Sequence, residues 1–435
     1  MPSAEMLVLL ATLLSVLLIA ASARSRGPAP ISIALASSAL FAAISLTLRG
    51  PPGVIGLAAS ASSLTSCTFM LAAQDLVEIP RKGLVASSLV LLTAFSILAP
   101  LSISPEVDDL VRMLIYWEGL GFTIVGALGI RGTREEHEAS AKYVLVTFVG
   151  ALVAMIGAVM AVNEVGSTSV REVVLRASGA SKAIMISGLL AEAAAFPMHF
   201  WLPDVHTTMF PPVAVALMGA ATPAAAYVAG TLAFEAGAFV RPLVIALALA
   251  TSLFSTLAAA RQEDFKRLLA YSTSSHVGYA LFAFSSGIPD YGSVHVLAHA
   301  LSKVPIFLEA YFLAEVLGAR RVEDVGALGE GPGALVLAAS SLGLMGLPPF
   351  LTFYSELMIF SRAFLRGGGW TLAAATFFAI VVLSAAYALR PLMAYGASAA
   401  KGEAMPRRAS AVLLATAIAS VALALAWQPL VGYYF

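Results

Sequence analysis

Apolar runs of about 20 residues recur from one end of this chain to the other. A helix of that length crosses the hydrocarbon core of a bilayer with its backbone hydrogen bonds satisfied inside the segment. Of the 435 residues, 60% are hydrophobic and 11% are charged, whereas a soluble globular domain carries about 25% charged residues. The sequence therefore predicts an all-α polytopic membrane protein, with residues 1–435 forming a single transmembrane domain, and excludes a soluble enzyme.

Fourteen membrane spans are predicted from these runs. The loops between them are short, so no extramembrane domain is expected. The first run has Glu5 as its only early charge and basic residues only after it, which predicts a retained span rather than a cleaved signal peptide. The predicted spans cover residues 4–22, 30–48, 52–73, 83–103, 108–130, 141–162, 178–196, 211–232, 240–259, 268–287, 291–316, 332–361, 370–395 and 409–431.

Lysine and arginine residues divide unequally between alternate loops. Sixteen fall on the side of the first loop and seven on the other side, while Arg112 and Lys303 lie inside spans. Cytoplasmic loops carry the excess of basic residues, so we expect a multi-pass protein of the cell membrane with both termini on the outer side. A missed span would assign every later loop to the opposite side of the membrane and remove the excess of basic residues on one side. The same distribution therefore supports the number of spans.

Two predicted spans contain helix breakers near an ionisable residue. In the seventh span Pro197 and Pro203 follow Glu192, and in the twelfth span Pro348-Pro349 precede Glu356. Broken helices at corresponding positions of two halves are typical of transporters, because the freed backbone has to line a polar cavity.

The two breaks fall in segments that each contain five predicted helices. These segments, at about residues 83–232 and 240–395, are expected to form two inverted repeats.

Several ionisable residues are predicted to lie inside the membrane, where a charge costs about 2.5–3.5 kcal/mol on insertion scales and therefore needs a reason. Glu118 lies near the middle of the fifth span, where the alternative to a functional role is an ion pair that only joins helices. Glu309 and Glu315 are expected instead to reach the membrane interface at the inner end of the eleventh span. The predicted proton-translocation residues are Glu118, Glu192, His276, His299, Lys303 and Glu356.

His299 and Lys303 are four residues apart, so they share one face of a helix. Apolar neighbours leave Lys303 poorly solvated, and such a lysine can take and release protons at physiological pH. The alternative is a permanently charged lysine paired with a carboxylate. His276 has serine and threonine neighbours that suit a hydrated path, and its alternative role is that of a satisfied core histidine.

No metal site, bound cofactor or nucleophile arrangement is predicted. His199 and His206 are seven residues apart across two prolines, with Asp204 between them, which is not a convincing ligand spacing. Cys67 is the single cysteine, so a disulfide framework and an Fe–S cluster held by thiolates are excluded. Net charge is zero, which gives no basic surface for nucleic acid. Proton transfer through Glu, Lys, His and water is the chemistry that these residues support.

Five sequence motifs occur in the order found in a known family. The chain resembles the antiporter-like membrane subunits of respiratory complex I, of multi-subunit Na⁺/H⁺ antiporters and of membrane-bound energy-converting hydrogenases. The resemblance covers about residues 80–400. The motifs are Tyr116-Trp117-Glu118; PMHFWLPDVH from Pro197 to His206; DFKRLLAYS from Asp264 to Ser272; HALSK from His299 to Lys303; and GLPPF from Gly346, followed by FYSE ending at Glu356.

The resemblance implies a path of acidic and basic residues near mid-membrane. Glu118, Lys303 and Glu356 match the family's helix 5 glutamate, central lysine and distal glutamate. Two residues depart from the pattern: Glu192 stands where the helix 7 lysine is usual, and Pro223 where the helix 8 lysine is usual. Glu192 thus replaces a cation with an anion, and we expect the first half of the path to work differently from the second.

The function implied is that of a subunit of a redox-driven complex that translocates H⁺, with Na⁺ as the alternative ion. Its partners would be other membrane-arm subunits and lipid. Any enzymatic activity, such as NADH- or ferredoxin-dependent quinone reduction or hydrogenase activity, would belong to the complex, because this chain carries no redox ligands. The alternatives are a stand-alone cation/proton antiporter and a degenerate structural subunit of such a complex.

Overall fold

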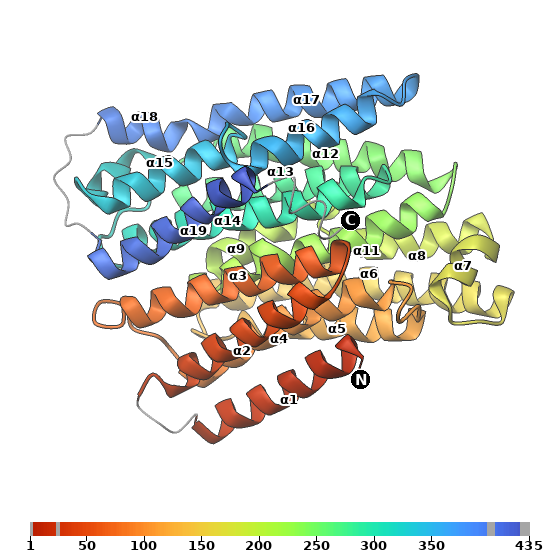
Figure 1. The fold of residues 1–435 in the computed structure, drawn as a ribbon, viewed down its shortest axis with the longest axis horizontal. Coiled ribbons are helices and arrows are strands. Elements are labelled where there is room, and N and C mark those ends of the chain that lie inside the picture. The colour runs from red at the N-terminus through yellow and green to blue at the C-terminus, as the bar shows by residue number, and fades with distance from the viewer. Residues whose placement is uncertain (1–2, 23–26, 398–404, 427–435) are drawn as a thin grey trace.

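The computed structural model describes residues 3–22, 27–397 and 405–426. Over these residues the chain is helical throughout, apart from loops and one isolated bridge between Asp264 and Arg321. The helices run in roughly the same direction and form one long bundle (Figure 1). The prediction of an all-α polytopic membrane protein is confirmed.

The first half of the bundle contains one short 3₁₀ helix and one π-helical turn besides its α-helices. Its elements are α1 (Ala4–Ser22), α2 (Ala29–Thr47), α3 (Pro51–Ala72), α4 (Lys82–Ser102), α5 (Leu110–Ala127), α6 (Arg134–Val165), α7 (Val170–Arg176), α8 (Gly179–Glu192), η1 (Met198–Phe200), α9 (Trp201–Thr208), α10 (Pro211–Ala216), η2 (Leu217–Ala221, the π-helical turn) and α11 (Thr222–Glu235).

The second half has a similar mixture of long and broken helices. Its elements are α12 (Val240–Ala260), α13 (Phe265–Ser285), α14 (Pro289–Glu315), η3 (Val322–Leu328), α15 (Pro332–Leu344), α16 (Leu351–Phe364), α17 (Gly369–Ala388), α18 (Arg390–Ala397) and α19 (Arg407–Leu425).

Eleven helices among the described residues are long and apolar enough to cross a membrane. Three of the fourteen predicted spans fall outside this group, each for a physical reason. The seventh and twelfth are broken, so that α8, α15 and α16 have 13 or 14 residues each. The tenth, α13, is long enough but carries the polar run from Ser272 to His276.

Helix α14 lies inside the bundle and contacts α3, α13, α15, α16 and α19. Its side chains are buried from Gly292 to Ala314. A helix that is surrounded by other helices can carry polar groups at membrane depth without exposing them to lipid. This position makes α14 the element from which the polar interior of the second half is built.

Both predicted helix breaks are present. The first covers residues 193–200, between α8 and α9, and the second covers residues 345–350, between α15 and α16. A side chain bonds a carbonyl near the end of the preceding helix across each break: Trp201 Nε1 donates to Ala191 O at 3.0 Å, and Thr352 Oγ1 donates to Gly343 O at 2.5 Å.

A hydroxyl group from another helix also accepts a backbone N–H at each break. Thr251 Oγ1 accepts from Phe196 N at 2.7 Å, and Ser420 Oγ accepts from Leu351 N at 3.2 Å. The breaks are therefore held by hydrogen bonds that replace those of the interrupted helices.

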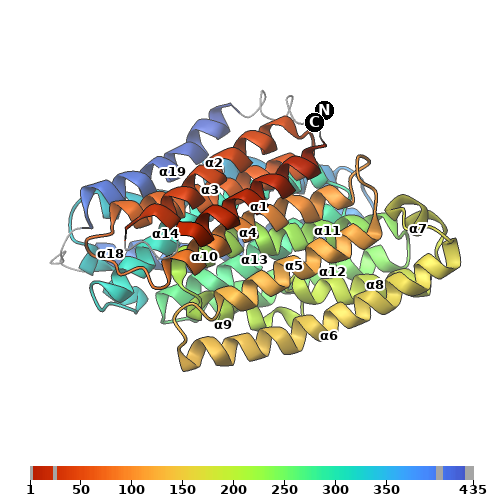
Figure 2. The ribbon, with the colours of Figure 1, turned by 90° about the horizontal axis from the view of Figure 1, so that it is seen from below.

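Close backbone contact joins α6 to α8, which lie along one edge of the bundle (Figure 2). A Cβ atom on Gly188 would lie 2.3 Å from Ala154 N, and one on Gly157 would lie 2.2 Å from Met185 N. Small residues permit this approach, which is how helices associate in a membrane without a hydrophobic driving force. The contact fixes α8, and with it Glu192 at its end, against α6.

Two glycines of α8 provide a matched test of this contact. Gly179 has no atom within 4 Å of a Cβ position, so Gly179→Ala should leave stability unchanged or raise it by up to about 1 kcal/mol through helix propensity. Gly188→Ala gains the same propensity but pushes the two backbones apart, and should destabilise the chain by about 1–3 kcal/mol. Thermal unfolding in detergent measures both effects. Equal melting temperatures for the two variants would contradict the close contact.

Candidate functional site

Helix α14 presents three ionisable residues on one face, at His295, His299 and Lys303. Their spacing of four residues places them one above another along the helix. The side chains are buried, and the face is turned toward α13 and α16. Two of the three were predicted from the sequence, and His295 was not.

Lys303 is fully buried, and its Nζ donates to Ser272 Oγ on α13. Among the residues that the structure describes, no carboxylate lies within 4.0 Å of this amine. The alternative of a lysine in a permanent ion pair is therefore not observed. Since an unpaired buried ammonium is costly, the amine has to share its charge with hydroxyl groups and water or give up its proton.

A chain of hydrogen bonds links the histidines to neighbouring hydroxyl groups. His276 Nδ1 lies 3.2 Å from His295 Nε2, and Tyr387 Oη on α17 lies 3.3 Å from His276 Nε2. His295 Nδ1 lies 3.1 Å from Ser355 Oγ on α16. The rings of His276 and His299 are also close, with centroids 4.8 Å apart.

The network assigns the ring protons. The Ser355 hydroxyl donates to Thr352 O at 2.8 Å, so it is left to accept from His295 Nδ1–H. His295 Nε2 then accepts from His276 Nδ1–H, and His276 Nε2 accepts from the Tyr387 hydroxyl. Every donor in the chain points toward α16.

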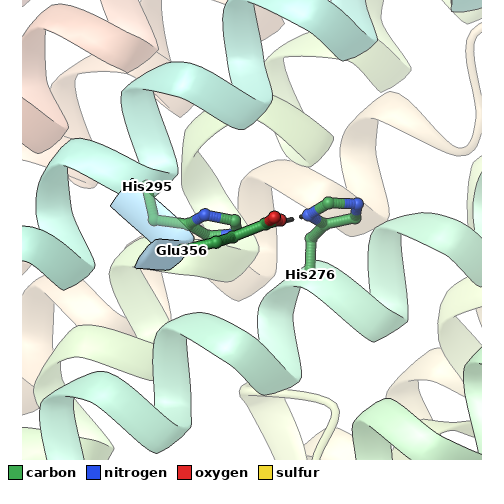
Figure 3. A group of neighbouring side chains, drawn as sticks. All are labelled: His276, His295 and Glu356. Carbon is green, nitrogen blue, oxygen red and sulfur yellow. Dashed lines mark hydrogen bonds between the residues drawn. The ribbon is translucent and has the colours of Figure 1, made fainter. Parts of the chain in front are cut away.

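Glu356 completes this cluster. One oxygen of its carboxylate and one ring nitrogen from each of His276 and His295 lie within 4.8 Å of one another, and all three residues are buried. Figure 3 shows the Glu356 side chain reaching toward the gap between the two rings. The structure therefore brings His276, His299, Lys303 and Glu356 of the predicted residues together, and adds His295 and Tyr387.

The sequence contained a usable signal for His295 and none for Tyr387. His295 precedes His299 by four residues, which is the spacing that singled out His299 and Lys303. Tyr387 lies in an otherwise apolar run on a helix distant in the chain, so only the fold places its hydroxyl beside His276. His276, His295 and Glu356 lie on three different helices, so spacing along the sequence does not show that they lie together.

Glu309 does not reach the membrane interface as predicted. Its side chain is fully buried, and neither carboxylate oxygen has a hydrogen-bond partner among the described residues. Glu315 does reach the end of the helix, where it lies 3.7 Å from Arg131 Nη1 and 3.8 Å from Lys266 Nζ. The prediction is wrong for Glu309 because the buried part of α14 continues past this residue to Ala314.

Further buried polar atoms line the same region without a protein partner among the described residues. Buried polar groups in proteins are almost always hydrogen-bonded, and water supplies the bond where protein does not. Water molecules between α13, α14 and α15 would satisfy these atoms. They are His206 Nδ1 and Nε2, His299 Nε2 and the hydroxyl groups of Ser274, Ser302, Ser340 and Ser341.

The first half contains a different arrangement. Glu192 is buried at the end of α8 and accepts a hydrogen bond of 2.6 Å from Tyr143 Oη on α6. Glu118 is half-buried on α5 and lies within electrostatic range of Glu192 and Tyr143. Lys182, at the other end of α8, donates to Val174 O at 3.1 Å. Among the described residues no cation pairs with either carboxylate.

The remaining predicted positions are not part of a polar cluster. Pro223 stands at the start of α11, directly after the π-helical turn, where the family pattern has a lysine. His199 lies in the first break beside Phe196. Asp204 forms ion pairs with Lys142 and Arg267 at the basic end of the bundle, rather than facing His206.

Residues 107–383 match the family described as NADH:quinone oxidoreductase/Mrp antiporter, TM. The Hydrogenase-4 component F homolog of Methylacidiphilum infernorum is 29% identical over 268 residues, which are 55% of this chain and 56% of that protein. NADH-quinone oxidoreductase subunit N of Desulforudis audaxviator is 35% identical over 213 residues, which are 46% of this chain and 41% of that protein. The chain spans about half the length of the curated relatives it matches.

Solved structures share the fold over nearly the whole chain. A chain of the membrane-bound sulfane sulfur reductase, an archaeal respiratory membrane complex, has a TM-score of 0.88 at 20% identity, covering 99% of this chain and 96% of that one. A chain of the Mrp complex from Dietzia sp. DQ12-45-1b has a TM-score of 0.83 at 19% identity, covering 99% and 95%. Because the family match covers more than half of its residues, this multi-pass membrane protein belongs to the NADH:quinone oxidoreductase/Mrp antiporter transmembrane family.

Proposed function

We propose that this chain is an antiporter-like subunit of a redox-driven membrane complex and that it moves H⁺, or Na⁺, through its buried polar interior. Relatives named as quinone oxidoreductase subunits and as a hydrogenase component support this assignment. Electron transfer would take place in other subunits. The path would run through Glu118, Glu192, Lys303, His299, His276 and Glu356.

The observation that carries the proposal is the unpaired amine of Lys303. A lysine that only joined helices would be paired with a carboxylate, whereas this amine faces a serine hydroxyl and lies within electrostatic range of His299 and His206. Such an amine can change its charge without breaking an ion pair. A change of charge at Lys303 is then felt directly by the histidines one turn away.

The proposed transfer in the second half uses the histidine chain. A proton taken up at His276 Nε2 lets His276 release its Nδ1 proton to His295 Nε2, which lies 3.2 Å away. His295 then returns to the neutral form by giving a proton to the Glu356 carboxylate, which belongs to the same cluster. Each step moves one proton, and the two rings end neutral.

Exposed residues at the helix breaks favour a subunit over a stand-alone antiporter. Pro348 and Pro349 in the second break, and Pro197 and Met198 in the first, are exposed on the surface of the chain. Irregular backbone at membrane depth is tolerated where protein or water surrounds it, but not against lipid. Partner subunits that cover these surfaces would meet that requirement.

Lys303→Ala should reduce ion pumping per electron to background in membrane vesicles that contain the native complex. Lys303→Arg should fail as well, because a guanidinium group does not release its proton at accessible pH. Lys182→Ala is the matched control, since this lysine bonds only a nearby carbonyl, and it should pump normally. Normal pumping by an assembled Lys303→Arg complex would remove Lys303 from the path, and normal pumping by Lys303→Ala would favour the degenerate structural subunit.

Substitutions of the two buried glutamates should have unequal effects. Glutamine at position 192 can still accept the Tyr143 hydrogen bond but cannot carry a proton, so Glu192→Gln should assemble normally and lose less pumping than Glu356→Gln. Glu356→Gln removes the group that accepts a proton from His295, so pumping should fall by about tenfold or more. The same vesicle measurement, normalised to the amount of assembled complex, compares them. The reverse order of losses would contradict the proposed difference between the two halves.

The distribution of basic residues supports an orientation with both termini outside. The only native thiol, Cys67, is buried, so single introduced cysteines can be labelled against a low background. Thr168→Cys, in the loop between α6 and α7, should react with an impermeant maleimide added to intact cells. Glu263→Cys, between α12 and α13, should react only in inverted vesicles. Labelling from the opposite sides would overturn the orientation.

A further inference from the structure

We propose that His276, His295 and Glu356 form a binding site for a divalent transition-metal ion of the Zn²⁺ class. The site lies within the second half of the bundle, where side chains from α13, α14 and α16 converge (Figure 3). Metal binding at this point would stop proton transfer through the second half. The proposal of a metal-binding site rests on the geometry alone, whereas the proposal that the metal stops proton transfer rests on the proposed function.

The two histidines already have the spacing of metal ligands. Ligand nitrogens at about 2.0–2.1 Å from a tetrahedral Zn²⁺ lie roughly 3.3 Å from each other. His276 Nδ1 and His295 Nε2 are 3.2 Å apart. A metal ion bound by both nitrogens would therefore need no change in the distance between them, although each ring would have to turn so that the two lone pairs converge on the metal.

The outer nitrogen of each ring is held by an oxygen atom. His295 Nδ1–H donates to Ser355 Oγ, which leaves Nε2 with its lone pair toward the cluster. His276 reaches the same state when its proton moves from Nδ1 to Nε2 and the Tyr387 hydroxyl changes from donor to acceptor. Histidine ligands of metals are oriented in this way, with the second N–H bonded to an oxygen. The ring pair therefore releases no net proton on binding a metal.

Glu356 supplies an anionic ligand within 4.8 Å of both nitrogens. Rotation of its side chain closes the remaining distance, and its charge offsets part of that of the metal. Its carboxylate also borders a surface cleft of 250 Å³ lined by Met345, Gly346 and apolar residues of α16 and α17. Water from this cleft can occupy the fourth coordination position.

The donor set selects the class of ion. Two imidazole nitrogens and one carboxylate oxygen suit Zn²⁺ and Co²⁺, while Mg²⁺ and Ca²⁺ require oxygen ligands in larger number. Among the described residues, this is the one group of three ligand-bearing side chains close enough to hold a metal. A bound cation would take the place of the proton that passes between the rings, and it would repel a proton on Lys303, which lies within electrostatic range of His276.

Co²⁺ titration of the purified full-length chain in detergent tests the site. Wild type should bind one Co²⁺ with the intense visible absorption of a tetrahedral complex, and Zn²⁺ should displace it. His276→Gln, His295→Gln and Glu356→Gln should each weaken binding by at least about tenfold. His206→Gln and Glu309→Gln are matched controls, because they replace a buried histidine on α9 and a buried carboxylate on α14 that do not belong to the group of His276, His295 and Glu356. Both should bind as wild type does.

Equal Co²⁺ affinity in wild type and the three cluster variants would overturn the proposal, as would a thiolate-to-cobalt charge-transfer band from Cys67. Size-exclusion elution and thermal unfolding identify any variant that fails to fold, and the charge-transfer test on wild type needs no variant. Ion flux with and without Zn²⁺ is measured separately in vesicles that contain the complex. Metal binding without any inhibition of ion flux by Zn²⁺ would overturn only the proposal that the metal stops proton transfer. Loss of ion flux in Lys303→Ala has no bearing on Co²⁺ binding. The two proposals therefore fail in distinguishable ways.

Discussion

The enclosure of a lysine amine without a counter-ion is the constraint on which the second half of this protein depends. Lys303 is fully buried, and α14, which carries it, has protein on every side over most of its length. Because no carboxylate among the described residues pairs with the amine, hydroxyl groups, histidines and water have to surround it. The polar run of α13 supplies Ser272 and His276 for this purpose, and that run keeps α13 outside the eleven helices that are apolar enough to cross a membrane, although the sequence predicted a span there.

Sequence reasoning predicted where the long apolar helices lie and the bounds of several of them. The bounds of α1 and α12 were predicted to within one residue and those of the enclosed α14 to within two, whereas α6 begins seven residues before its predicted start, at Arg134. The broken helices were also predicted, because Pro197 and Pro348-Pro349 lie beside an ionisable residue and each proline removes a backbone donor and clashes with the preceding turn. Proline alone does not decide the outcome, since Pro305 lies inside the unbroken α14. What the sequence left unresolved was the depth of enclosure around α14. Glu309 looks like an interfacial residue from its place near a helix end, and only the packing of α15 beside it shows that it is buried.

The candidate site was predictable where its residues share a helix and not where helices meet. Four-residue spacing identified His299 and Lys303, and the same spacing was available for His295. Tyr387, Ser355 and Tyr143 each contribute a hydroxyl group whose importance depends on a partner on another helix. Spacing along one helix carries no information about such pairs, so these contacts follow from the fold alone.

The two halves are connected through α9, although their chemistry differs. The ring of Trp201 at the start of α9 packs edge-on against Tyr143, with centroids 4.9 Å apart, and Tyr143 holds Glu192. One and a half turns later on the same helix, His206 is buried within electrostatic range of Lys303. In the first half the partner of Glu192 is a tyrosine hydroxyl, and among the described residues no ion pair at Glu192 can respond to a distant charge. A field acting on His206 and a movement of α9 are two ways in which a change of charge at Lys303 would reach Glu192. Since α9 contacts both α6 and α13, a small shift of this short helix alters the Tyr143–Glu192 hydrogen bond and the surroundings of Lys303 together.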